Sequence, residues 1–124
     1  VVRKWISGHL NSKKINMGWH PPHPGLTIRS KVFNEIGMFD INFPLSADYE
    51  FMLRLFRQKK FSTFYLEEVL VKMLTGGVSS SVNGIFRGVI QIYNAHIKNG
   101  DNRLKVVFIL FKRYVTKIMQ ILFK

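Results

Sequence analysis

The sequence contains no cysteine, which excludes disulfide frameworks, thiolate zinc sites and cysteine nucleophiles. A reducing cytoplasm is compatible with that absence. The 124 residues also lack the roughly 18 uninterrupted apolar positions that a membrane-spanning helix needs. The chain opens on Val1 rather than methionine, from which we expect a piece of a longer protein. Its 47% hydrophobic and 14% aromatic residues are nevertheless enough to build a core.

Acidic residues are scarce, with seven against 19 lysines and arginines, and the formal net charge is +12. The cations gather at the two ends, because residues 1–31 and 84–124 hold fourteen basic groups and one acid between them. A strongly basic chain with interleaved aromatics is compatible with nucleic-acid binding. No RNA- or DNA-binding motif is present, however, and the charge sits at the two ends of the chain rather than along one face of a sheet. Nucleic acid is therefore the less favoured partner.

Hydrophobic spacing and turn residues predict a chain that contains both helices and strands. Helices are expected after a Ser30 N-cap up to Gly37, after a Ser46 N-cap up to about residue 58, and over about 82–98 and 104–123. The triple-proline stretch 20–25 predicts a rigid loop. Short apolar, β-branched and aromatic runs predict strands over 26–28, 61–66 and 69–74. The predicted fold class is therefore α/β, with few strands, covering helices and a helical tail.

The last predicted helix is basic and amphipathic. Its apolar stripe comprises Leu104, Phe108, Phe111, Val115, Ile118 and Leu122. One interpretation is that Phe108, Phe111 and Leu122 enter an anionic membrane surface while Lys112, Arg113 and Lys117 meet its head groups. The other is that the apolar side packs on another part of the protein or on a partner. The sequence leaves both open.

Asp48 is the candidate for chemistry. It falls in the first turn of a predicted helix, where free backbone N–H groups and the helix dipole stabilise a negative charge. A carboxylate in that position can accept a proton from an incoming hydroxyl if the site is partly shielded from water. Acidic residues are common in first turns, so physical reasoning alone favours an ordinary stabilising role.

Five short motifs occur in a fixed order: 18–24 (GWHPPHP), 28–31 (IRSK), 37–40 (GMFD), 47–54 (ADYEFMLR) and 71–79 (VKMLTGGVS). Together they resemble the C-terminal half of family 2 glycosyltransferases, inverting enzymes of the GT-A fold, and in particular bacterial enzymes that build surface polysaccharide such as lipopolysaccharide or capsule. The likeness covers about residues 17–80. It implies a Rossmann-like, acceptor-side half-domain over residues 1–80, followed by a helical basic tail over 81–124.

The resemblance also assigns roles. Asp48 matches the family's general base, which deprotonates the acceptor hydroxyl of a glycan or glycolipid as it attacks the sugar of a nucleotide-sugar donor. His23 would line the sugar and acceptor site. The simpler interpretation is that its side chain only hydrogen-bonds to the backbone of its own loop. Glu50 belongs to the same motif as Asp48. Arg29 and Arg54 occupy family arginine positions, and a structural ion pair is at least as plausible for Arg54 as a phosphate contact.

The glycine-rich end of the last motif is a candidate phosphate site. Gly76, Gly77 and Ser79 could offer backbone N–H groups to the donor's diphosphate, or they could form only a turn. The family often carries an arginine just before these glycines. Here Lys72 is the nearest cation, which weakens the assignment.

An Asp-x-Asp motif is missing from the whole sequence. In the family this motif lies in the N-terminal half and holds the Mg²⁺ or Mn²⁺ that neutralises the leaving diphosphate. We therefore expect the metal ligands to lie outside this chain, and this chain alone to be inactive. The resemblance implies a cytoplasmic protein, peripheral at the inner face of the cell membrane. The alternative is a basic, non-catalytic module that binds anionic membrane or nucleic acid.

Overall fold

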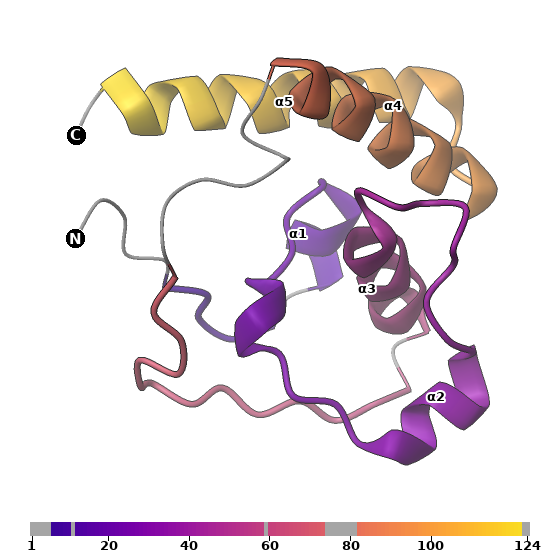
Figure 1. The fold of residues 1–124 in the computed structure, drawn as a ribbon, viewed down its shortest axis with the longest axis vertical. Helices are drawn as coiled ribbons and strands as arrows, with labels where there is room; N and C mark the ends of the chain where they lie inside the picture. Colours follow the sequence, from indigo (N-terminus) through magenta and orange to yellow (C-terminus); the bar gives the residue numbers. More distant parts are fainter. Residues whose placement is uncertain (1–5, 11, 59, 74–81, 123–124) are drawn as a thin grey trace.

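A computed structural model describes residues 6–10, 12–58, 60–73 and 82–122. Within these ranges all regular structure is helical. The elements are α1 (Ser12–Asn16), the 3-10 turn η1 (His23–Gly25), α2 (Ser30–Ile36), α3 (Ala47–Arg57), α4 (Val82–Lys98) and α5 (Arg103–Leu122). Figure 1 shows α4 and α5 as a layer along one side of the molecule, with α1 and α3 beneath it and α2 at the far end.

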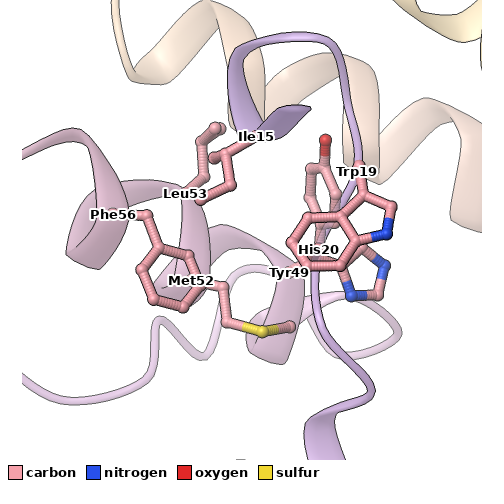
Figure 2. A pocket seen from close by; sticks show the side chains of 7 residues that line it. All are labelled: Ile15, Trp19, His20, Tyr49, Met52, Leu53 and Phe56. Carbon is pink, nitrogen blue, oxygen red and sulfur yellow. The ribbon is translucent and has the colours of Figure 1, made fainter. Parts of the chain in front are cut away.

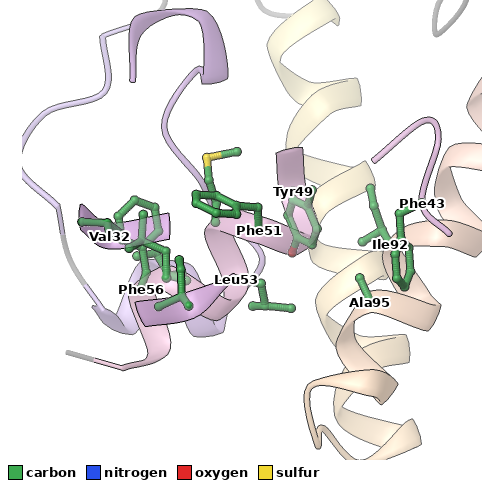
Figure 3. Close-up of a cluster of buried hydrophobic side chains, with 12 residues drawn as sticks. Val32, Phe43, Tyr49, Phe51, Leu53, Phe56, Ile92 and Ala95 are labelled. Carbon is green, nitrogen blue, oxygen red and sulfur yellow. The ribbon is translucent and has the colours of Figure 1, made fainter. Parts of the chain in front are cut away.

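Helix α3 is the centre of the fold. Seven of its eleven residues are buried, including the charged Glu50. A helix that is apolar on most of its circumference must be covered on several sides, and α3 packs against both α1 and α4. Figure 3 shows the resulting core, in which Phe51 and Leu53 of α3 lie between Val32 of α2 and Ile92 of α4.

The seam between α1 and α3 is filled by side chains. Ile15 of α1 and Trp19, which follows it, face Tyr49, Met52 and Phe56 of α3 (Figure 2). The packing leaves no room there for a water molecule. This seam is therefore part of the core and not a binding site.

Helices α4 and α5 are tied to the rest of the chain by specific contacts. Gln91 of α4 accepts hydrogen bonds from the Leu45 N–H (2.9 Å) and the Ser46 hydroxyl (3.2 Å), just before α3 begins. Helix α5 passes so close to Gly18 that a Cβ there would lie 2.6 Å from Ile109 Cγ2. Gly18 also has a φ of +85°, so both the space and the backbone conformation require glycine.

The predicted α/β class, and with it the Rossmann-like GT-A half-domain that the resemblance implied, is wrong for the described part of the chain, which is helical. The segments 26–28, 61–66 and 69–73 form no strand, and residue 74, the end of the last predicted strand, lies outside the described ranges. A strand exists only when its N–H and C=O groups pair with another extended segment, and the described chain brings no such partner alongside. As a result, Phe64 remains 89% exposed and Val69 67% exposed.

The helix predictions are largely confirmed, but their caps are not. The predicted range 82–98 is the range of α4, and Gly37 has the expected positive φ of +82° after α2. Ser30 is the first residue of α2 and not its N-cap. Ser46 occupies the N-cap position of α3 but makes no side-chain capping bond, because its hydroxyl is used to hold Gln91.

Candidate functional site

An open cleft of about 310 Å³ lies at the N-terminal end of α3. Its volume is at the lower end of the usual range for small-molecule sites, about 300–1,000 Å³. Two polar side chains line it among apolar ones, and the lining residues are His23, Phe39, Pro44, Leu45, Ala47 and Asp48. Thus residues from three of the five motifs, separated by up to 25 positions in the chain, meet at one cleft.

Asp48 is half-buried in the first turn of α3. One carboxylate oxygen, Oδ1, accepts a hydrogen bond from the backbone N–H of Tyr49 at 2.8 Å. This bond occupies a free donor of the helix N-terminus and fixes the carboxyl group at the edge of the cleft. The other oxygen can accept a hydrogen bond or a proton from a group that enters the cleft.

His23 and Phe39 also line the cleft. Their rings meet edge to face with centroids 5.9 Å apart, and Phe39 is 39% exposed. The Nδ1 atom of His23 is buried and has no hydrogen-bond partner among the described residues. Buried polar atoms in folded proteins are nearly always paired, so this nitrogen is an exception within the described part of the chain.

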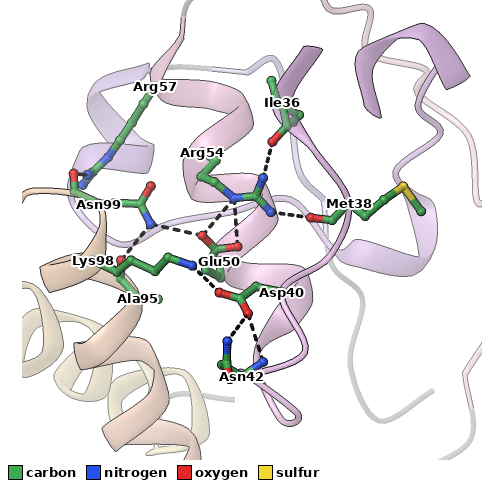
Figure 4. Close-up of polar contacts among 10 residues, drawn as sticks. All are labelled: Ile36, Met38, Asp40, Asn42, Glu50, Arg54, Arg57, Ala95, Lys98 and Asn99. Carbon is green, nitrogen blue, oxygen red and sulfur yellow. Dashed lines mark hydrogen bonds and ion pairs between the residues drawn. The ribbon is translucent and has the colours of Figure 1, made fainter. Parts of the chain in front are cut away.

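Glu50 and Arg54 do not face the cleft but form a structural pair inside the protein. The Glu50 carboxylate is fully buried, and Arg54 Nε donates to both of its oxygens at 2.9 Å. Asn99 at the end of α4 adds a 3.3 Å bond to the same carboxylate. Figure 4 shows the remaining nitrogens of Arg54 reaching the carbonyl oxygens of Ile36 and Met38.

This pair shapes the cleft indirectly. By holding the Met38 carbonyl at 2.7 Å, Arg54 fixes the turn that carries Phe39 into the cleft. The same turn is closed by Asp40, which accepts bonds from the N–H and the side-chain amide of Asn42 and pairs with Lys98 of α4. Hydrogen bonding to Lys98 lowers the pKa of Asp40. Arg54 is therefore a positioning residue for the cleft, since Nε and both terminal nitrogens each bond to groups of the protein itself.

Two other predicted site residues, Arg29 and Lys72, do not line the cleft with Asp48. Arg29 is exposed just before α2, and Lys72 is exposed near the end of segment 60–73, which Figure 1 shows along the edge opposite α4 and α5. Gly76, Gly77 and Ser79 lie outside the described residues. The described residues also contain no group of three or more acidic or histidine side chains placed to hold a metal ion.

A second polar network, buried beside the cleft helix, escaped the sequence-based predictions. The Tyr49 hydroxyl lies 2.7 Å from His96 Nε2, and His96 Nδ1 lies 2.6 Å from Asp101 Oδ2. Arg57 and Lys105 donate to the same carboxylate. Because a carboxylate can only accept, Nδ1 carries the proton and Nε2 accepts from Tyr49. The only sign of this network in the sequence is that His96 lies on the apolar side of α4, one turn after Ile92.

Burial and hydrogen bonding shift the titration of this network. Burial raises the pKa of Tyr49 to about 12 and lowers the pKa of His96. Burial also acts to raise the pKa of Asp101, but hydrogen bonds from Lys105, His96 and Arg57 outweigh it and bring the pKa to about 2. The network is therefore a neutral Tyr–His pair attached to an ionised carboxylate. Because His96 is fully buried, a substrate cannot reach the network. The network instead joins α3, α4 and α5.

Comparison with known proteins adds no relative: no family model, no curated protein and no solved structure matches the chain. The resemblance to family 2 glycosyltransferases therefore stays a prediction from the five motifs. The cleft geometry stands independently of it.

Replacing Arg54 with methionine should lower the free energy of unfolding by about 3–5 kcal/mol, because Glu50 would remain buried without its counter-charge. Urea denaturation followed by circular dichroism measures this. The control is Lys60→Met, which breaks an exposed pair with Glu35 and should cost at most about 1 kcal/mol. Adding Glu50→Gln to the Arg54 variant should recover part of the loss, and equal losses for Arg54 and Lys60 would contradict the buried-pair interpretation.

Stability should fall as the pH drops below the ordinary histidine pKa of 6.5. The unfolded chain binds a proton at His96 near that pH, whereas the folded chain does so only at lower pH, so protonation favours unfolding. A further loss should follow between about pH 4 and pH 2 as Asp101 is protonated. Thermal unfolding across this range should show a shallower decline between pH 7 and 5 for His96→Gln. The exposed-histidine control His9→Gln should keep the wild-type profile, and an unchanged slope for His96→Gln would contradict the assignment.

Proposed function

We propose that this chain is the acceptor-binding part of an inverting glycosyltransferase, in which Asp48 removes the proton from the acceptor hydroxyl. The observation that carries the proposal is the meeting of Asp48, His23 and Phe39 at one open cleft of about 310 Å³. All three lie in motifs that resemble family 2 enzymes, yet nothing in their spacing along the chain requires them to meet. Support thus comes from the motif order and from the cleft independently.

The lining of the cleft has the chemistry that a sugar requires. A pyranose presents apolar C–H faces and polar hydroxyl edges, so it is held by an aromatic ring together with hydrogen-bonding side chains. Phe39 supplies the ring, the Asp48 carboxylate supplies an acceptor, and the His23 imidazole is the second polar side chain of the lining. The volume suits one sugar unit of an acceptor and not an extended chain.

The proposed reaction needs one base and no protein nucleophile. The acceptor hydroxyl gives its proton to the free oxygen of Asp48 while the hydroxyl oxygen bonds to the anomeric carbon of the donor sugar. The bond from that carbon to the diphosphate breaks on the opposite face, and the nucleoside diphosphate leaves with the electron pair. Attack opposite the leaving group inverts the configuration. Cleft residues contribute by orienting the acceptor.

The donor is not accounted for by the described residues. The resemblance implies that nucleotide-sugar and divalent-metal sites belong to the N-terminal half of the family domain. Lys72 and Arg29 lie apart from the cleft, so neither supports a donor site here. We therefore propose acceptor recognition and proton removal for this chain, and transfer only together with a donor-binding half.

Acceptor recognition can be tested on the chain itself by saturation-transfer difference NMR with the methyl glycosides of glucose, galactose, mannose and N-acetylglucosamine. At least one should receive saturation from the wild-type protein. Phe39→Ala should weaken its binding about fivefold, because an aromatic contact contributes about 1 kcal/mol, and Asp48→Ala should also weaken it.

The matched controls are Phe64→Ala and Glu67→Ala, which remove an exposed ring and an exposed carboxylate on segment 60–73. Both should bind like the wild type. Absence of binding to all four glycosides, or equal weakening by the cleft and control substitutions, would overturn the proposal.

A further inference from the structure

Only a narrow strip of α5 packs against the core, and most of its apolar side chains are exposed to solvent. Val106 and Ile109 are buried, with 0% and 3% exposure. Seven large apolar side chains on the other side are between 41% and 82% exposed, and we call them the α5 outer face: Leu104, Val107, Phe108, Phe111, Val115, Ile118 and Met119. The stripe predicted to be apolar therefore points away from the protein, except Leu122, whose side chain is not described.

The α5 outer face is a continuous surface. At 100° per residue its members fall within an arc of about 120°, and a helix of 20 residues is about 30 Å long. An exposed apolar surface of this extent is rare on a soluble monomer and marks an interaction site. No helix among the described residues is long and apolar enough to cross a bilayer.

Positive charge borders this face on both edges. Arg103 lies at one edge beside Val107, and Lys105 and Lys112 lie at the other beside Phe108. All three are exposed, Lys105 while also pairing with Asp101 at 2.7 Å just before the helix, and α5 itself contains no acidic residue. Arg113, which the sequence suggested for the same role, instead turns inward, where it donates to the Gly18 carbonyl at 2.7 Å and lies 5.2 Å from the Tyr49 ring.

From this arrangement we infer that α5 binds an anionic lipid surface, with its outer face in the acyl–head-group boundary and Arg103, Lys105 and Lys112 against the head groups. Interfacial helices have this combination of an apolar face and a cationic border. The inference goes beyond the proposed function and does not depend on it.

Charge complementarity favours lipid over a second copy of the chain. Pairing two α5 outer faces would bring the cationic borders of two molecules with a net charge of +12 each into proximity with no acidic group on either helix. Like charges at such an interface oppose association. An anionic bilayer supplies the missing negative charge and covers the apolar side chains at the same time.

Co-sedimentation with vesicles tests the inference. The protein should bind vesicles of phosphatidylcholine mixed with phosphatidylglycerol, bind phosphatidylcholine alone at least about tenfold more weakly, and lose affinity at high salt. Phe108→Gln/Phe111→Gln and, separately, Arg103→Glu/Lys112→Glu should each weaken binding at least about tenfold. Glutamine and glutamate keep helix propensity, and circular dichroism should show unchanged helix content.

Matched controls carry the same changes elsewhere. Met38→Gln/Phe64→Gln replaces two exposed apolar side chains outside α5, and Arg29→Glu/Lys31→Glu reverses two exposed charges at the start of α2, which Figure 1 places far from α5. Both should bind like the wild type.

A tryptophan reporter gives a readout that does not depend on affinity. Phe108→Trp should add fluorescence that brominated lipid quenches beyond any quenching of the native Trp5 and Trp19, whereas Phe64→Trp should add none that is quenched. Three results would overturn the inference: no binding to anionic vesicles, equal loss in the control variants, or a dimer in solution that Phe108→Gln/Phe111→Gln dissociates without any vesicle binding.

Discussion

The buried pair between Glu50 and Arg54 is the constraint on which the candidate site depends. A carboxylate with no exposure is costly unless it is neutralised and hydrogen-bonded, and Arg54 does both while also binding two backbone carbonyls after α2. One side chain thus joins the central helix to the turn that carries Phe39. Asn99 connects the same carboxylate to the end of α4. The ion pair that neutralises Glu50 in the core therefore also fixes the turn that shapes the cleft at the surface.

The first turns of α3 contribute both to the core and to the cleft, from different sides of the helix. Its Tyr49 and Glu50 point into the protein, where they hold α4 through His96 and Asn99. Asp48, between Ala47 and Tyr49, points to the cleft. Adjacent residues of a helix differ in direction by about 100°, so a motif of consecutive residues can combine a structural core with a chemical group. This explains why Asp48 and Glu50, two acidic residues of the same motif, have different surroundings.

Sequence patterns predicted the helices well because their signals are local. Apolar residues at helical spacing and Gly37 located α2, α3 and α4 almost to the residue. Strand predictions failed because residues such as Phe64 and Val69 satisfy the local preference for a strand, while strand formation requires a partner elsewhere. The direction of α5 also could not be read from its sequence, since an apolar stripe indicates burial against something without identifying what covers it.

The site was predictable only in part. Asp48 and His23 were identified from motifs. Phe39, in contrast, is placed at the cleft by the contacts of Arg54 with Met38 and of Asp40 with Lys98, which join segments distant in the chain. The Tyr49–His96–Asp101 network likewise depends on how α3, α4 and the start of α5 pack. Long-range contacts of this kind leave little trace in residue spacing. Arg54 illustrates the same limit, because its role was decided by carbonyl groups 16 and 18 residues earlier.

The crystal structure of this chain with a bound methyl glycoside tests the central claim most directly. The Asp48 carboxylate should accept a hydrogen bond of about 2.7 Å from a sugar hydroxyl, and the apolar face of the sugar should lie on the Phe39 ring. A sugar bound elsewhere on the surface, or one in the cleft with every hydroxyl out of reach of Asp48, would contradict the claim that this carboxylate is the base.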